Sequence, residues 1–274
     1  MSNYDHIQTE DENGNTRHTS TSEPSFKAVS LGGGPPVTEV LGVEPPDGKI
    51  YADDGNTYSD PSAAESAASE YLVFGAGSFD TLQVNTADLS VWGMGNATVI
   101  DPGFGYGIDV DAAGVSIRNL RIDSPSSAVD LSGGDLTLEN LNITSGQQGV
   151  WSTGSVTVRH CVFEATGYYG LNLRGPDNLV EWCRFRDGIT QGAVRTTDND
   201  NIVANCRIDG PGEDALLMSG NNDIIQGNRI SNAGWDGIDV QGSDQIVALN
   251  RVSGSGASNI NSGTNTTLSG NLTG

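Results

Sequence analysis

Basic residues are scarce in this chain. Its 274 residues include 13 Lys and Arg against 35 Asp and Glu, so the formal net charge is −22. Only two of the basic residues are lysines, Lys27 and Lys49, and both precede residue 72. Because phosphate binding requires a basic surface, this composition excludes duplex DNA and RNA from the expected partners.

The excess of acidic residues also indicates the environment of the protein. A surface with this much negative charge repels itself at low salt, whereas at molar salt the Debye length is about 3 Å and the repulsion is screened. The composition resembles that of proteins from extreme halophiles, especially haloarchaea. An acidic surface protein from a mesophile is the alternative.

Long apolar runs and cysteine motifs are also missing. The first thirty residues contain no apolar stretch, so they predict neither a secretory signal peptide nor a membrane span. The three cysteines, Cys161, Cys183 and Cys206, are spaced by 22 and 23 residues, which fits neither a zinc motif nor a set of disulfides. No cofactor is expected from these features.

Three segments follow one another along the chain. Residues 1–50 are polar and then rich in Gly and Pro, which predicts an extended arm that attaches to a partner. Residues 51–71 are expected to form a capping segment, with a short helix over 60–70 that starts at the N-cap residue Asp60. Residues 72–274 are repetitive.

The repeat consists of a small residue, an aliphatic residue, a turn and an eight-residue strand, and it recurs every 21 to 23 residues. Such a period predicts a solenoid in which each repeat forms one coil. We therefore expect an all-β fold, a single-stranded right-handed parallel β-helix. The eight-residue strands begin at residues 115, 136, 156, 178, 201, 223, 245 and 266.

The aligned strands show which side chains point inward. Their third and eighth positions are almost always aliphatic or Phe, so these positions are expected to stack in the core. The sixth position holds leucines, then cysteines, then asparagines, which predicts stacked core thiols followed by hydrogen-bonded amides. The polar residues of this structural ladder are Cys161, Cys183, Cys206, Asn228, Asn250 and Asn271.

The two ends of the repeat region differ. The short helix is expected to cover the first coil, whereas the repeat register continues to residues 271–274 (NLTG) without a capping segment. Terminal coils of a solenoid usually need a cap. We therefore expect either that another subunit covers the last coil or that this coil is frayed.

The first coils carry a resemblance to a known family. Residues 71–79 (YLVFGAGSF), 82–84 (LQV), 89–93 (LSVWG) and 97–101 (ATVID) are similar to the opening turns of pectate-lyase-like and carbohydrate-binding β-helix proteins. Residues 72–274 as a whole resemble that superfamily, which implies the β-helix fold. The resemblance implies no single activity, because this fold carries lyases, hydrolases, epimerases, phage tailspikes and adhesins.

One outer face of the predicted rod combines aromatic, amide and charged side chains. They lie on or just before the short strand that follows each small residue, where aromatic rings and carboxylates suit sugar binding. The expected ligand-binding residues are Trp151, Tyr168, Tyr169, Asn172, Arg195, Glu213, Asp214, Trp235, Asp236 and Asp239. If this face were catalytic, Asp214, Asp236 and Asp239 would supply the acid and base. The alternative is that a very acidic surface brings such neighbours together by chance.

Motifs of β-helix enzymes are incomplete in this sequence. Residues 198–200 (DND) only partly match the Asn-Thr-Asp segment of polygalacturonase-like enzymes, and residues 169–172 (YGLN) match only the first half of an alginate-epimerase-like motif. His160, the single histidine of the repeats, is expected to pack in a core strand. The Asx-rich turns at 199–200 and 221–223 could bind Ca²⁺, but turn formation explains them equally well.

These features favour a structural or binding role over an enzyme. We expect a virion structural protein, a surface spike, capsid turret or tail-fibre module of a halophilic archaeal virus, assembled in the host cytoplasm. Resemblance to viral β-helix spikes implies a homotrimer that contacts host surface glycans or glycoproteins, with residues 1–50 bound to other virion proteins. The alternatives are a carbohydrate-active enzyme and a non-catalytic cell-surface protein.

Overall fold

The computed structural model describes residues 8–10, 16–18, 27–29, 37–39, 45–186 and 188–274, and it divides into the units 1–44 and 45–274. In the first unit, four short strands form two antiparallel pairs. They are β1 (Gln8–Glu10) with β2 (Thr16–His18), and β3 (Lys27–Val29) with β4 (Val37–Glu39). The other residues of the predicted arm up to 44 lie outside the described residues.

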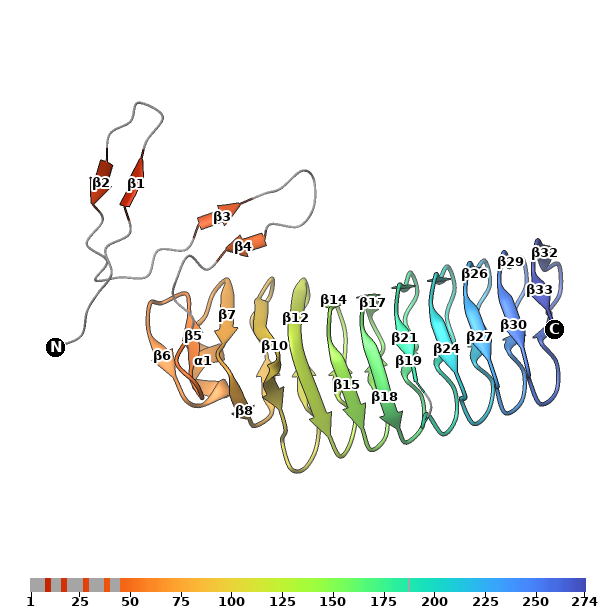
Figure 1. The fold of residues 1–274 in the computed structure, drawn as a ribbon, viewed down its shortest axis with the longest axis horizontal. Coiled ribbons are helices and arrows are strands. Elements are labelled where there is room, and N and C mark those ends of the chain that lie inside the picture. The colour runs from red at the N-terminus through yellow and green to blue at the C-terminus, as the bar shows by residue number, and fades with distance from the viewer. Residues whose placement is uncertain (1–7, 11–15, 19–26, 30–36, 40–44, 187) are drawn as a thin grey trace. The chain divides into compact units, whose positions relative to one another are not determined.

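The second unit begins with the predicted cap. Its elements are β5 (Ile50–Ala52), β6 (Thr57–Tyr58) and α1 (Pro61–Ala67), at one end of the rod in Figure 1. The capping helix is thus confirmed, although it is shorter than 60–70. The Asp60 carboxylate accepts a hydrogen bond from the Ala63 backbone N–H at 2.8 Å, which fixes the start of the helix. In the described part of the chain, no helix is long and apolar enough to cross a membrane.

The helix is tied to the first coil through a buried carboxylate. Glu65 is only 5% exposed, and its Oε1 accepts hydrogen bonds from the backbone N–H groups of Asn85 and Thr86 at 2.8 and 2.9 Å. Ala64 and Ala68 belong to the same buried core as the coils that follow. The cap therefore closes the core of the first coil rather than lying beside it.

The rest of the unit is a parallel β-helix, right-handed as parallel crossovers are. One of its faces is a single nine-stranded parallel sheet, which we call sheet 1. Its strands are β9 (Leu82–Val84), β11 (Ile108–Val110), β13 (Val129–Leu131), β16 (Val150–Ser152), β19 (Leu171–Leu173), β22 (Val194–Thr196), β25 (Leu216–Met218), β28 (Ile238–Val240) and β31 (Ile260–Asn261). The predicted fold class is thereby confirmed.

The other two faces share the long strands of the first coils, and from β14 onward each face has its own short strands. The first coils use β7 (Tyr71–Phe74), β8 (Gly77–Phe79), β10 (Ser90–Ile100) and β12 (Val115–Ser124). Sheet 2 continues with β14 (Asp135–Glu139), β17 (Ser155–Arg159), β20 (Leu179–Glu181), β23 (Ile202–Ala204), β26 (Ile224–Gln226), β29 (Ile246–Ala248) and β32 (Thr267–Ser269). Sheet 3 continues with β15 (Asn142–Ser145), β18 (Val162–Thr166), β21 (Arg184–Phe185), β24 (Arg207–Asp209), β27 (Arg229–Ser231), β30 (Arg251–Ser253) and β33 (Leu272–Thr273).

The first predicted eight-residue strand, 115–122, is confirmed as part of β12, but the later ones are wrong as single strands, because from β14 onward each is two short strands. The fifth residue of each segment has a positive φ, for example 56° at Asn119, 54° at Asn140 and 55° at Asn205. Side chains of a continuous strand alternate between its two faces. The left-handed residue shifts this alternation, so positions three, six and eight can all point inward.

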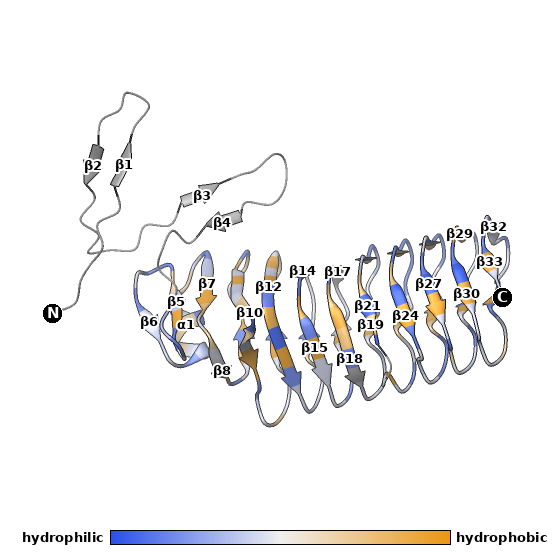
Figure 2. Cartoon of the chain, viewed as in Figure 1, coloured by the Kyte–Doolittle hydropathy of each residue, from blue (hydrophilic) through white to orange (hydrophobic). Residues whose placement is uncertain are grey.

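The predicted core columns are confirmed up to the last coil. Ile117, Val180 and Val247 in the third position, like Phe163 and Phe185 in the eighth, are at most 1% exposed. The two phenylalanine rings stack with their centroids 4.7 Å apart. Figure 2 shows hydrophobic residues recurring on the strands of successive coils. In the last coil, Leu268 is 51% exposed, since no further coil lies against it in the structure.

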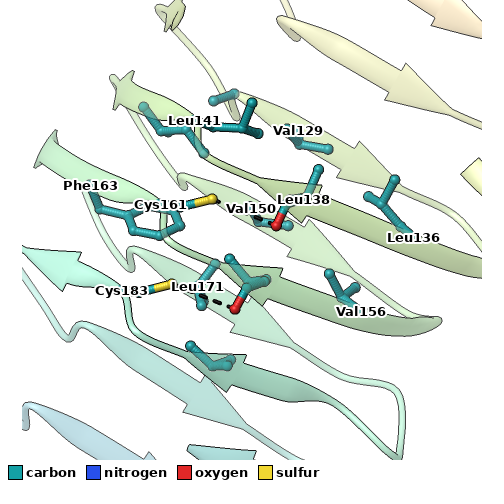
Figure 3. Close-up of a cluster of buried hydrophobic side chains, with 14 of the residues drawn as sticks. Val129, Leu136, Leu138, Leu141, Val150, Val156, Cys161, Phe163, Leu171 and Cys183 are labelled. Atoms are coloured by element: carbon teal, nitrogen blue, oxygen red, sulfur yellow. Dashed lines mark hydrogen bonds between the residues drawn. The ribbon is translucent and has the colours of Figure 1, made fainter. Parts of the chain in front are cut away.

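The sixth position confirms the predicted cysteine stack. Cys161, Cys183 and Cys206 are free thiols, at most 2% exposed. Figure 3 shows Cys161 and Cys183 inside the rod, with hydrogen bonds to carbonyl oxygens of the preceding coil, including that of Leu138 at 3.7 Å from Cys161. Hydrogen bonding to Cys161 and then burial raise the pKa of the Cys183 thiol well above its ordinary value, so it stays protonated.

The asparagines that follow are hydrogen-bonded as predicted. We call Asn228, Asn250 and Asn271 the asparagine ladder. The Oδ1 atom of each accepts the backbone N–H of the corresponding residue one coil earlier, at 2.9 Å in every case. Each Nδ2 donates to a backbone carbonyl oxygen, that of Val203 in the case of Asn228. The ladder therefore satisfies backbone groups at a corner of the rod.

A second buried polar ladder was not anticipated. It occupies the first position of the strand segments and runs through Asn178, Asn201 and Asp223. Asn178 accepts the backbone N–H of Val156 at 2.9 Å, and Asp223 accepts that of Asn201 at 2.9 Å. Asp223 is completely buried, and burial raises the pKa of its carboxyl to about 6.

Candidate functional site

The outer column of sheet 1 lies as the repeat predicted. Parallel pairing places Trp151, Asn172 and Arg195 side by side on β16, β19 and β22. Asp109 and Asp130 precede them in the column, while Leu217, Asp239 and Asn261 follow. Neighbouring strands of a sheet lie about 4.8 Å apart, so each side chain of the column can contact the next.

A pocket of about 230 Å³ opens at the edge of this column, and we call it the Tyr168 pocket. It brings together four of the predicted ligand-binding residues, Tyr168, Tyr169, Asn172 and Arg195. Its other lining residues are Gln147, Gln148, Arg174 and Gln191.

Each arginine of the pocket lies over an aromatic ring. The guanidinium carbon of Arg195 lies 5.6 Å from the centre of the Tyr169 ring, and that of Arg174 lies 5.7 Å from the centre of the Trp151 ring. Cation–π contacts of this kind hold an arginine in place without neutralising its charge. Tyr168 is 49% exposed, so its ring is available to a ligand.

Several polar atoms of the pocket are buried without a partner. Among the described residues, eleven buried side-chain atoms have no hydrogen-bond partner, and three of them, Asn172 Oδ1, Gln148 Oε1 and Arg195 Nε, lie in this pocket. Asn172 is only 3% exposed. A buried polar atom without a partner costs about 1–3 kcal/mol, so an unsatisfied group of this kind calls for an explanation such as a ligand.

The pocket is positively charged within a very acidic protein. No carboxylate lines it, whereas two arginines do. Among the other described arginines of residues 45–274, Arg118, Arg121, Arg159 and Arg186 form ion pairs, whereas four on sheet 3 form none: Arg184, Arg207, Arg229 and Arg251. Neither pocket arginine has an ion pair within the described part of the chain. The pocket thus offers two unpaired cations to a ligand.

Burial, together with basic and acidic neighbours, shifts the pKa of the Tyr169 phenol. Burial is the main cause that raises its pKa, Arg195 opposes this effect, and Glu213 and Asp214, two coils further on, add to it. Tyr169 is therefore a neutral hydroxyl that can donate or accept a hydrogen bond at physiological pH. The acidic residues act on the pocket from its border without lining it.

The other predicted residues lie outside the pocket. Trp151 reaches it only through Arg174, and Trp235 is 59% exposed three coils further on. The candidate acids hold the coils together. The Asp214 carboxylate accepts the backbone N–H of Asp236 at 2.9 Å, and that of Asp236 accepts the backbone N–H of Ser258 at 2.6 Å.

Asp239 has similar contacts within the sheet. It is 7% exposed and accepts hydrogen bonds from the side-chain amides of Gln241 and Asn261, both at 2.8 Å. Burial is the first cause that raises the pKa of Asp214. The three carboxylates therefore support the backbone and the sheet around them.

A different pair of carboxylates was not anticipated as a candidate site. Asp109 and Asp130 face each other in register on β11 and β13. Burial, followed by repulsion from Asp109 and Asp111, raises the pKa of Asp130 to about 6. The pKa of Asp109 is raised too, mainly by burial. This pair lies one strand from Trp151, at the opposite end of the column from Asp239.

The prediction that His160 packs in the core is wrong. His160 is exposed, because it is the left-handed fifth residue of its segment, with a φ of 54°. Side chains at this corner point out of the rod, as does that of Trp182, which is 56% exposed. The prediction assumed that His160 lies within a continuous core strand, whereas the left-handed residue at this corner directs its side chain outward.

The Asx-rich turns form hydrogen bonds between coils. Asn199 Oδ1 accepts the backbone N–H of Asn221 at 2.8 Å, and Asn221 Oδ1 accepts that of Ser243 at 2.9 Å. In the described residues, no three His, Cys, Asp or Glu side chains gather so that they could hold a metal ion. These asparagines therefore link successive coils.

Sequence reasoning missed half of the pocket. Gln148 and Gln191 fall in the aligned turn columns, but glutamines at turns carry no distinctive signal. Gln147 and Arg174 belong to none of the core or outer columns. The sequence feature that could have identified Arg174 as a site residue is its positive charge, because basic side chains are few on this face.

Comparison with known proteins identifies the fold. The family model described as the right-handed β-helix region matches residues 106–273, more than half of the chain. No curated protein and no solved structure matches the chain. The match covers the Tyr168 pocket and carries no specific activity with it.

Proposed function

We propose, since this chain belongs to the right-handed β-helix family, that it is a glycan-binding protein whose sugar site is the Tyr168 pocket. The observation that carries this proposal is the set of buried, unpartnered polar atoms on Gln148, Asn172 and Arg195 beside an exposed tyrosine ring. A sugar presents hydroxyls to such atoms and an apolar ring face to an aromatic side chain.

The charge of the pocket favours an acidic sugar. Arg174 and Arg195 provide donors for a carboxylate or a sulfate, and no acidic side chain lines the pocket. An anionic group also tolerates molar salt when its hydrogen bonds are partly buried, since buried pairs are screened less than exposed ones. We therefore propose a glycan that carries an acidic residue at this position.

The test uses an array of neutral, uronic-acid-containing and sulfated oligosaccharides at molar salt. We expect binding to acidic members, and a loss of at least tenfold in affinity for Arg195→Gln, because hydrogen bonds to charged groups contribute about 1.5–3 kcal/mol. Arg207→Gln is the matched control, since Arg207 is exposed on sheet 3, away from the pocket. The proposal fails if no oligosaccharide binds, or if both variants lose affinity equally.

An enzyme acting on carbohydrate is the second candidate, and the Asp109–Asp130 pair favours it. Two adjacent carboxylates, one of which has a pKa of about 6, are what general acid catalysis at a glycosidic bond needs. If the protein is such an enzyme, it has to cleave or otherwise convert the oligosaccharides that bind on the array. Loss of turnover in Asp130→Asn with binding unchanged would support it, whereas binding without any turnover by the native protein excludes it.

The biological setting we propose is the surface of a halophilic archaeal virus. The acidic composition, the rod-like repeat region and a separate unit of residues 1–44 support a spike, turret or tail-fibre module. We propose a homotrimer bound to other virion proteins through residues 1–50, with host glycans as its target and no required cofactor. Mass spectrometry of purified virions and light scattering at molar salt test this. A monomer absent from virions would contradict it.

A further inference from the structure

Exposed aromatic side chains recur along one edge of the rod. Within the described residues, Phe104 is 90%, Tyr106 42%, Tyr168 49% and Trp235 59% exposed. All four lie in the turns that lead into strands of sheet 1. We call these four residues, together with Tyr169, the aromatic row. Exposing large aromatic rings to water is unfavourable, so a row of them on one edge indicates a contact surface.

The backbone hydrogen bonds fix the spacing of the row. From Tyr168, successive bonds lead through Gln191 and Glu213 to Trp235, which is three coils away. From Tyr106, the aligned positions Ser127 and Gln148 lead to Tyr169, also three coils away. Three coils correspond to about 14 Å along the axis. The aromatic groups are therefore evenly spaced on both sides of the Tyr168 pocket.

The intervening positions carry no aromatic side chain. The aligned residues between the aromatic groups are Ser127, Gln148, Gln191 and Glu213, together with Gly192 and Asp214. Such side chains can bind hydroxyls along a ligand without blocking its path. A compact sugar in the pocket would contact neither Phe104 nor Trp235. A ligand that uses the whole row has to run parallel to the rod axis.

We infer that the protein binds an extended linear glycan along this edge, with its acidic residue in the Tyr168 pocket and further sugar rings against Trp235 on one side and Phe104 and Tyr106 on the other. The inference rests on the proposed function, because the pocket supplies the central contact. It specifies the direction of the bound glycan along the rod, its minimum length and two outer sugar subsites. Acidic side chains next to Trp235, such as Asp236, suit neutral sugars there, since their carboxylates accept hydroxyl hydrogens.

The experiment is an array of uronic-acid-containing oligosaccharides of defined length, from dimer to decamer, read at molar salt with the full chain. The native protein should bind longer members progressively more tightly. Trp235→Ala should weaken the decamer about tenfold and leave the trimer unchanged, because each aromatic contact contributes roughly a kcal/mol. Phe104→Ala should act in the same way from the other end.

The matched control is Trp182→Ala. Trp182 is 56% exposed, almost the same as Trp235, but it lies at the corner between sheets 2 and 3. It should have no effect at any length. Equal binding of trimer and decamer, or equal effects of Trp235→Ala and Trp182→Ala, would overturn the extended site while the pocket itself still binds. Absence of binding at every length would instead remove the proposed function.

Discussion

The asparagine ladder and the Tyr168 pocket both bury amide side chains in the same β-helix, but only the ladder uses all their hydrogen-bonding atoms. Asn228 and Asn250 each accept one backbone N–H and donate to a carbonyl oxygen. In the pocket, Gln148 and Asn172 each keep a buried oxygen without a partner among the described residues.

Under the proposed function, the satisfied amides of the ladder hold the fold and the unsatisfied amides of the pocket serve the ligand, although Asp223 Oδ2 is also buried without a partner among the described residues. Both kinds repeat at the coil period, so the period alone does not distinguish them. A satisfied amide stabilises the rod, because removing it leaves backbone groups buried and unpaired. An unsatisfied amide costs stability until something binds. The following substitutions test this contrast by their opposite effects on stability.

The largest effect is expected in the asparagine ladder. Asn228→Ala removes the partner of the Cys206 backbone N–H and of the Val203 carbonyl oxygen. We expect the free energy of unfolding to fall by about 2–4 kcal/mol. Chemical denaturation of the variant at molar salt measures this. A loss below about 0.5 kcal/mol would mean that the ladder is not a structural device.

A smaller effect of opposite sign is expected at Asp223. Its carboxyl has a folded pKa of about 6, above its ordinary value of 3.8, because it is buried. Such a group stabilises the fold when protonated, and this contribution is lost as the pH rises from about 4 through 6. Asn keeps the oxygen that accepts from Asn201 and removes the charge.

Asp223→Asn should therefore raise the free energy of unfolding by about 1–3 kcal/mol at pH 7. The gain should disappear near pH 4, where the native carboxyl is protonated. Denaturation curves of both proteins across this range provide the measurement. A gain that does not depend on pH would show that charge at this position is not the cause.

The smallest effect is expected for Asp130, which is partly exposed. Its pKa of about 6 arises from burial and from the neighbouring Asp109. By the same sign argument, Asp130→Asn should stabilise the protein above pH 6 and leave it unchanged near pH 4. Solvent screening keeps the gain below about 1 kcal/mol. Thermal unfolding at the two pH values measures it, with destabilisation at pH 7 as the contrary result.

The sequence predicted the fold in detail, because the core columns repeat in every coil. Ile117, Val180 and Val247 occupy one column of the repeat, and all three are buried in the structure. The break within each strand segment was not predicted. Asn119 and Asn140 tolerate the left-handed conformation, but Trp182 and Leu249 adopt it as well, which residue preferences alone do not indicate.

The pocket was predicted only in part. Tyr169, Asn172 and Arg195 fall in columns that the period defines. Arg174 reaches the pocket only because it lies over the Trp151 ring, a contact that depends on side-chain packing and not on the repeat. Unpartnered atoms are likewise a property of three-dimensional contacts, so a column such as that of Asn172 does not reveal them.

The most direct test of the glycan site is the variant Asn172→Leu, measured for both stability and sugar binding. Leu217 occupies the same outer column two strands on, so the sheet accepts leucine there. The substitution removes the buried unpartnered Oδ1 atom. The account predicts unchanged or higher stability and loss of binding to acidic oligosaccharides on the array. A clear loss of stability with binding retained would contradict it and would place Asn172 among the structural asparagines.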